Sequence, residues 1–167
     1  IGGNITLGAG DDALGIYGAA ELAAGAGIDG GSGLDTIIFA GNTGTWDASR
    51  FLDIEALGKQ GGGTSVITGN WMLGQGATSV VDSGILELAA GAELSTAVEV
   101  AARGTFLVNG VVRNGVTITE AGGIVGGSGS IGTAADLAGV RKANLVNAGI
   151  VGPGRLVAGS EFGTLTV

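Results

Sequence analysis

Apolar and polar residues alternate in short runs along this chain, and glycine or Asn-Gly closes each run. Residues 85–88, 98–100, 105–108 and 116–119 are rich in β-branched side chains and mostly alternate in polarity. Alternation with a period of two is typical of a half-buried β-strand, whereas a helix needs a longer window with a 3.6-residue period. The pattern predicts an all-β chain with little or no α-helix.

Residues 46–57 fit both periods. A helix there would begin at Asp47 or Ser49, either of which can cap it, and would gather its apolar residues on one face. The alternation of Leu52 and Ile54 with acidic residues fits a strand equally well. The sequence leaves helix and strand open for this segment.

Two independent internal repeats share one period of about 20 residues, which is typical of solenoid proteins. The hexapeptide Glu-Leu-Ala-Ala-Gly-Ala occurs at 21–26 and again at 87–92, an interval that corresponds to three such periods. A series of apolar positions recurs with nearly the same spacing, and its members are Leu86, Phe106, Val125, Leu145 and Leu165. This spacing predicts that the series forms one buried column.

Strands this short cannot complete a sheet within one period. If the periods stack, each strand pairs with its equivalent about 4.8 Å away and a continuous apolar core is buried. We therefore predict a right-handed parallel β-helix of about seven or eight rungs, a rung being one period of the coil. Glycine and asparagine, as at 109–110, 114–115 and Asn147, would supply left-handed backbone at the corners. An antiparallel sandwich, whose hairpins also use Asn-Gly, is the alternative fold.

Composition supports a folded chain of unusual type. The 167 residues include 37 glycines, one proline, no cysteine and no histidine, yet 45% are hydrophobic, which is enough to offset the entropy of ordering. The net charge of -8 argues against binding to nucleic acid or to anionic membranes. No apolar run is long enough for a spanning helix. The chain begins without Met or a signal peptide and ends on an apolar Leu-Thr-Val, so it is expected to be part of a longer protein.

Residues 30–38, Gly-Gly-Ser-Gly-Leu-Asp-Thr-Ile-Ile, have the spelling of a calcium-binding β-roll nonapeptide, and residues 8–14 form a partial copy. Calcium needs six or more oxygen ligands, which contiguous copies supply on neighbouring turns. Here the copies are not contiguous, because a whole rung separates them. Asp12 and Asp35 are the candidate ligands for one loosely held ion, and a solvated acidic turn is the alternative interpretation; no other metal or cofactor is expected.

The chain offers little for catalysis. Without His or Cys, imidazole and thiolate mechanisms are excluded, and the expectation is that the protein is not an enzyme. A cluster of Asp47, Arg50, Asp53 and Glu55 is interpreted as a salt-bridged, solvated face. Residues 126–130 lack the lysine and the following helix of a phosphate loop, and their serines have no partner base.

Trp46 and Trp71 are interpreted as filling the interior of the coil, with a sugar-stacking surface as the alternative. An interior position is preferred because a lone tryptophan more often fills the interior of a solenoid or caps a rung.

The order of several phrases resembles the C-terminal end of the passenger domain of bacterial autotransporters, often called the autochaperone region. These phrases cover most of residues 29–167 and are Asp-Gly-Gly-Ser-Gly-Leu-Asp-Thr-Ile-Ile-Phe at 29–39, Phe-Leu-Asp-Ile-Glu-Ala-Leu-Gly-Lys at 51–59, the glycine-rich phrases at 122–132 and 147–154, and Gly-Thr-Leu-Thr-Val at 163–167. In the family the Pro-Gly corner usually runs within a few residues into a Ser and the last phrase. Here residues 155–159 intervene, which affects the register of the last rung.

The resemblance implies a stem that is exported to the bacterial cell surface, either remaining at the outer membrane or released by cleavage. Residues 1–60 would be stem rungs and residues 61–167 autochaperone-like rungs of the same solenoid. The implied partners are further rungs upstream, a β-barrel translocator downstream in the same polypeptide, and host surface molecules. The isolated chain is expected to be monomeric, with end-to-end association through open strand edges.

The resemblance implies a structural function. The C-terminal rungs would seed folding of the stem, because a solenoid grows by adding rungs to an existing edge at low loop-closure entropy. An adhesive surface for host cells or matrix is the alternative, followed by a β-helix enzyme acting on carbohydrate.

Overall fold

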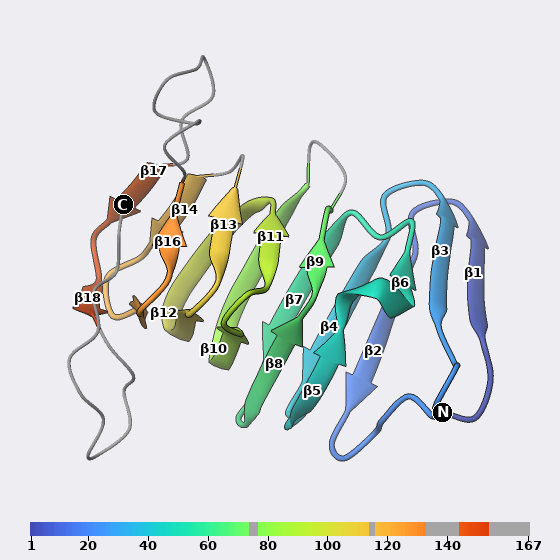
Figure 1. The fold of residues 1–167 in the computed structure, drawn as a ribbon. Coiled ribbons are helices and arrows are strands. Elements are labelled where there is room, and N and C mark those ends of the chain that lie inside the picture. Colours follow the sequence, from blue (N-terminus) through green and yellow to red (C-terminus); the bar gives the residue numbers. More distant parts are fainter. Residues whose placement is uncertain (74–76, 114–115, 133–143, 154–167) are drawn as a thin grey trace.

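The computed structural model describes residues 1–73, 77–113, 116–132 and 144–153, which form a parallel β-helix of about six turns with rungs of about 21 residues. In Figure 1 the chain advances from right to left, with the front strands running upward and those behind running downward, so the coil is right-handed. The strand pairs of the described residues are parallel. The predicted fold is confirmed, and the antiparallel sandwich is excluded.

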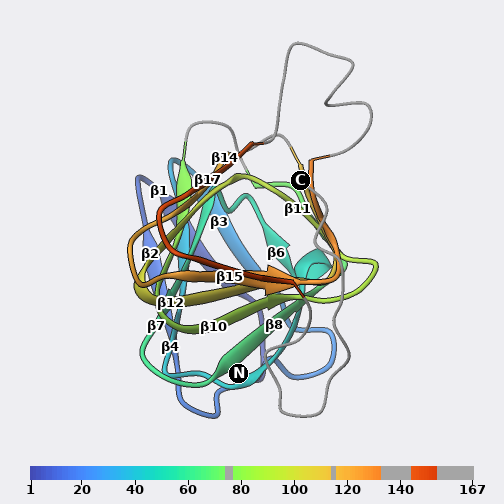
Figure 2. The same cartoon turned by 90° about the vertical axis from the view of Figure 1, so that its left-hand side faces the viewer.

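Each rung passes over three faces that enclose one interior (Figure 2). The first face consists of β2 (Ala13–Tyr17), β4 (Thr36–Ala40), β7 (Ala56–Gln60), the first halves of β10 (Thr78–Leu88) and β12 (Ala97–Val108), β14 (Val116–Thr119) and β17 (Asn144–Asn147). The second face consists of β5 (Gly44–Asp47), β8 (Thr64–Thr68), the second halves of β10 and β12, β15 (Ile124–Gly127) and β18 (Ile150–Pro153). The third face, at the front of Figure 1, consists of β1 (Ile5–Ala9), β3 (Ile28–Ser32), β6 (Phe51–Leu52), β9 (Asn70–Trp71), β11 (Glu93–Ser95), β13 (Val111–Arg113) and β16 (Ser130–Ile131).

The core consists of side chains stacked in columns along the axis. Because paired residues on adjacent strands point the same way, each inward position continues onto the next rung. One such column on the second face contains Trp46, Ile67, Leu88 and Val108. One on the third face contains Trp71, Leu94, Val112 and Ile131. All of these side chains are buried. Alternation along each short strand therefore becomes a continuous core.

The predicted apolar column is correct over its first three members and wrong at the fourth. Leu86 pairs with Phe106, and Phe106 with Val125, but the next partner of Val125 is Val151. Leu145 instead pairs with Thr117 on the first face. The step from β15 to β18 is longer than the steps before it, because the chain between β16 and β17 is longer than at the same corner of the preceding rungs.

The step between rungs is also long at the N-terminal end. At the N-terminal end, Ile5 pairs with Ile28, which is a longer step along the chain than that between Leu86 and Phe106. The structure has about six turns, whereas the expectation of seven or eight rungs was made for all 167 residues. Leu165, the phrase at 163–167, the interval 155–159 and the Asn-Gly pair at 114–115 lie outside the described residues.

Residues 46–57 form strands and one short turn. β5 ends at Asp47, a single 3₁₀ turn spans Ala48–Arg50, and β6 begins at Phe51. Asp47 caps the 3₁₀ turn, with its carboxylate accepting the Ser49 N–H. The predicted capping residue is therefore correct, although no α-helix follows it.

The repeated hexapeptide forms the same reverse turn twice, three rungs apart. Gly25 and Gly91 both have a φ of 79°, and in each copy the last alanine N–H donates to the carbonyl three residues earlier at 3.0 Å. The two copies precede β3 and β11, at the same corner of the coil. A glycine in left-handed conformation is required at the third position of such a turn.

Asn109 and Gly110 also lie at a corner, but for a different reason from the one predicted. Neither residue has a positive φ. A Cβ on Gly110 would lie 2.2 Å from the carbonyl oxygen of Ala92 on the preceding rung. Glycine is needed there because two rungs approach closely.

Candidate functional site

The acidic residues of the two nonapeptide-like copies meet at the corner between the third and first faces. Asp12 and Asp35 lie at equivalent positions of adjacent rungs. The Asp12 N–H donates to Oδ1 of Asp35 at 2.9 Å, and the Asp35 N–H donates to Oε2 of Glu55, one rung further, at 2.8 Å. Each of these carboxylates satisfies a backbone N–H that turns away from its own strand at the corner.

The calcium prediction at Asp12 and Asp35 stays a prediction, although the structure changes the interpretation of Asp35. Asp35 is fully buried, so the alternative of a solvated acidic turn is wrong for this residue. Its Oδ2 has no hydrogen-bond partner and lies beneath Gly30, where an added Cβ would approach it to 2.8 Å. Within the described ranges, no three His, Cys, Asp or Glu side chains are grouped to hold a metal ion. Asp35 and Glu55 therefore cap the backbone N–H groups of this corner.

The acidic residues between β5 and β7 do not converge on Arg50. The Asp47 carboxylate accepts hydrogen bonds from the N–H and the hydroxyl of Ser49, at 3.0 and 2.8 Å. These bonds hold the pKa of Asp47 below its usual value of 3.8. Glu55 accepts from the neighbouring rung, and Asp53 turns the corner with a φ of 47°.

Arg50 instead holds a loop of the preceding rung. Its guanidinium donates to the carbonyl oxygens of Leu22 at 3.3 Å and Ala26 at 2.7 Å, and also to that of Ala23. The ion pairs in the described part of the chain are Arg103 with Asp82 and Arg113 with Glu93. The predicted salt-bridged face at Arg50 is therefore wrong, because backbone carbonyls take the place of carboxylates.

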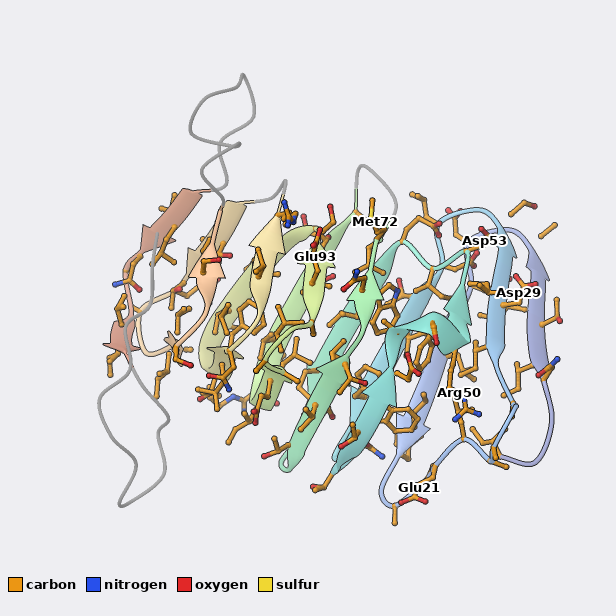
Figure 3. All side chains as sticks on the ribbon, in the orientation of Figure 1. Glu21, Asp29, Arg50, Asp53, Met72 and Glu93 are labelled. Atoms are coloured by element: carbon orange, nitrogen blue, oxygen red, sulfur yellow. The ribbon has the colours of Figure 1, made fainter. Side chains whose placement is uncertain are left out.

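Two hollows lie on either side of Arg50. One, of about 430 Å³, is bounded by Glu21, Leu22 and residues 44–47. The other, of about 340 Å³, lies over β1, β3 and β6, and we call it the first-rung hollow. Its polar lining side chains are Asn4, Thr6, Asp29, Ser49 and Arg50, and its apolar ones are Ile5, Ala26, Ile28 and Leu52. Figure 3 shows Asp29 and Arg50 on the same side of the first rungs, with Glu21 on the loop beyond Arg50.

Both tryptophans lie in the interior, as predicted. Trp46 and Trp71 are each 3% exposed. The ring centroids are 5.1 Å apart for Trp46 and Phe39, and 4.6 Å apart for Trp71 and Phe51. The indole N–H of Trp46 donates to Oδ1 of Asn42 at 3.0 Å, so its polar atom is satisfied. Neither ring is available to stack on a sugar.

A buried lysine occupies the column between Phe39 and Val81. The side chain of Lys59 is fully buried, and its Nζ donates to the carbonyl oxygens of Gln60, Gly61 and Gly62 at 3.1, 3.0 and 3.0 Å. Burial lowers the pKa of the Lys59 amine below its usual 10.5. From inside the coil, the lysine thus supplies the hydrogen-bond donors for the backbone carbonyls at the corner after β7.

The serine of the glycine-rich phrase is also used structurally. The N–H and the hydroxyl of Ser128 both approach Oδ1 of Asn109 at 3.2 Å, one rung earlier.

Sequence reasoning did not find Lys59 or the first-rung hollow. Lys59 has the same strand parity as Leu57, which is buried, so alternation would have placed it inward. The hollow depends on the loop held by Arg50, and no local pattern indicates a contact between Arg50 and Ala26 on different rungs.

The three-faced coil, its stacked core and its side-chain bonds between rungs define the protein as a parallel β-solenoid. No family model, no curated protein and no solved structure matches this chain. Among the described residues, no helix is long and apolar enough to cross a membrane.

Proposed function

We propose that this solenoid is a structural stem, and that its more C-terminal rungs seed folding of an autotransporter passenger displayed at the bacterial surface. The observation that carries the proposal is the pairing of β10 with β12. Among the described residues these are the longest strands, and ten residue pairs connect them across the first and second faces. They lie within residues 61–167, the part that resembles the autochaperone region.

A seed must be stable before the rest of the coil forms, and it must offer an edge to the next rung. β10 and β12 meet the first condition through their long register, with Leu86, Val98, Val100 and Phe106 fully buried between the faces. The second condition is met because β12 pairs onward with β14 and β15, and β10 pairs back to β7 and β8. Rungs can therefore add on both sides of this pair.

Outside this central pair the strands are two to five residues long. Such strands gain little from local contacts and depend on an edge that already exists. In this proposal the same polypeptide supplies further rungs upstream and a translocator downstream, and export delivers the seed to the surface first.

Refolding kinetics of matched core variants test the proposal. Leu86→Ala in β10 and Ile37→Ala in β4 each remove a fully buried aliphatic side chain and should each cost about 2–5 kcal/mol. If β10 belongs to the seed, Leu86→Ala slows refolding, whereas Ile37→Ala mainly accelerates unfolding. Stopped-flow denaturant jumps measure both rates.

Equal slowing of refolding by the two variants would contradict a seed at β10 and β12. Display is tested separately, by adding protease to intact cells of the bacterium that makes the protein. Cleavage without cell lysis is expected, and full protection until lysis would exclude the surface location.

A further inference from the structure

The apolar core is exposed at the C-terminal end of the coil, where Figure 1 shows β17 and β18. Val125 points inward and is fully buried, whereas its partner on the next rung, Val151, is 39% exposed. Leu145 continues the inward position of Thr117 on the first face and is only partly buried. The outer edges of β17 and β18 have no partner among the described residues. Inward apolar residues beside open strand edges indicate a surface that a further layer covers.

The chain continues from this end with a sequence that keeps the register of the third face. Residues 154–167 lie outside the described residues and follow β18 directly. In the two preceding rungs, the fourth residue after the end of the second-face strand is a buried residue of the third face, and these residues are Val112 and Ile131. The same step from Pro153 reaches Val157. In position along the chain, the interval 155–159 thus matches a third-face strand instead of an insertion.

The last phrase of the sequence keeps the register of the first face. Trp71 and Ser79 are buried residues of the third and first faces, on either side of the corner between β9 and β10. The same number of residues separates Val157 from Leu165.

The distance along the chain from the last first-face strand agrees with this register. Leu165 is as far from Leu145 as Ala56 is from Thr36, and the latter two are partners on adjacent rungs of the first face. Polar and apolar residues alternate over 164–167, so a strand there would turn Leu165 and Val167 to the same side. Two independent intervals thus assign Leu165 to the position above Leu145.

We propose that the exposed C-terminal end of the core is a docking surface for residues 154–167, which add one further rung with Leu165 over Leu145 and Val157 over Ile131. The segment is tethered to β18, so its effective concentration at this edge is high. A second copy of the chain would lose association entropy and would bring another molecule of net charge -8 against the first. The docked segment covers the strand edges that could otherwise pair between molecules. This docking does not depend on where folding begins, so the refolding test of β10 can fail without affecting it.

Cross-linking of introduced cysteines tests the register, because the chain has no native cysteine. Val146 lies on the outer side of β17 and is 55% exposed, and Thr166 becomes its neighbour about 4.8 Å away if the segment docks. Dibromobimane, which fluoresces when it bridges two thiols, should link Val146→Cys/Thr166→Cys within one molecule. The control pair Val146→Cys/Leu165→Cys has its second thiol turned into the core and should be bridged about tenfold more slowly or less.

Hydrogen exchange tests the docking in chains without cysteine. Leu165→Asp places a charge at the inward position, so the exchange rate of the β17 amides should rise about tenfold or more as the last rung opens. Thr166→Asp is the matched control in the same phrase, and because its side chain points outward it should leave that exchange rate unchanged.

Equal bridging rates in the two cysteine pairs would overturn the proposal, as would equal exchange rates in the two aspartate variants. Bridging between molecules alone, with a sedimentation coefficient that rises with protein concentration, would assign the surface to a second copy and would also overturn it.

Discussion

Lys59 illustrates how a single residue of this core carries charge without a neighbouring carboxylate. The ion pairs of the described residues do not include it, and its ammonium is held by carbonyl dipoles of the turn that follows. Three carbonyl oxygens match the three donors of an ammonium group. The lysine therefore satisfies its own three donors and supplies hydrogen bonds to carbonyls at the corner that follows β7.

The buried amine makes stability depend on pH in the alkaline range. The folded-state pKa of Lys59 is below 10.5, so between that value and 10.5 the unfolded chain binds more protons than the folded one. The free energy of unfolding should therefore rise with pH through this window. Urea unfolding at a series of pH values measures the change.

Lys59→Met is the control for other titrating groups, because it keeps the length of the side chain and removes the proton. The difference in unfolding free energy between wild type and this variant should grow in favour of wild type as the pH rises. A constant difference would show that the amine titrates as it does in the unfolded chain.

The inward position of Lys59 could have been predicted from the sequence. Strand alternation places it on the face of Leu57, but lysine is rarely buried and is usually assigned to the solvent. The partners that allow its burial are backbone atoms of the next turn, and these do not appear in a pattern of side chains.

At the scale of elements, the solenoid depends on contacts between successive rungs as much as on the strands themselves. Gly104, in the middle of β12, has no positive φ, yet a Cβ at that position would lie 2.0 Å from the carbonyl oxygen of Val81. This glycine allows β12 to pass beside the bulge between Val81 and Ser83 in β10.

Gly104→Ala should therefore destabilise the protein, by about 1–3 kcal/mol if the backbone can shift to accept the methyl group. Gly62→Ala is the matched control, because an added Cβ there meets nothing within 4 Å and the φ is not positive. The control should be neutral or slightly stabilising through the unfolded state. Thermal unfolding followed by circular dichroism compares the two, and equal melting temperatures would contradict the close-contact explanation.

Periodicity in the sequence was enough to predict strands, parallel pairing and much of the core. It succeeded for Leu86, Phe106 and Val125 because the rungs between them have nearly constant length. It failed at Leu145 because a longer connection precedes this residue, which lies on the first face, and Val151 takes the position beside Val125 instead. A spacing rule cannot detect such an insertion, since one apolar residue resembles another.

The whole molecule is acidic, with 15 Asp and Glu against seven Lys and Arg. Of those basic residues, Lys59 is buried and Arg50 is bound to carbonyls.

The candidate site is harder to predict from the sequence than the fold. The hollow exists only because Arg50 draws a loop of the preceding rung against the third face, and that contact depends on the assembled coil.

Self-repulsion among the acidic groups predicts that salt stabilises the fold. Raising the ionic strength from about 0.01 M to about 0.15 M shortens the screening length from about 30 to about 8 Å, which weakens repulsion between rungs. The Tm should rise with sodium chloride. A Tm that falls over this range would show that the surface ion pairs outweigh the repulsion.

The corner between the third and first faces varies in length while the strands on both sides keep their parallel pairing. Between β11 and β12 it is the single residue Thr96, and between β16 and β17 it spans residues 132–143. The fold thus already accepts additional chain at one place in each rung. For protein engineering, this corner is the natural position to graft a foreign peptide, and successive rungs would present copies of an epitope at regular intervals of about 4.8 Å along the axis.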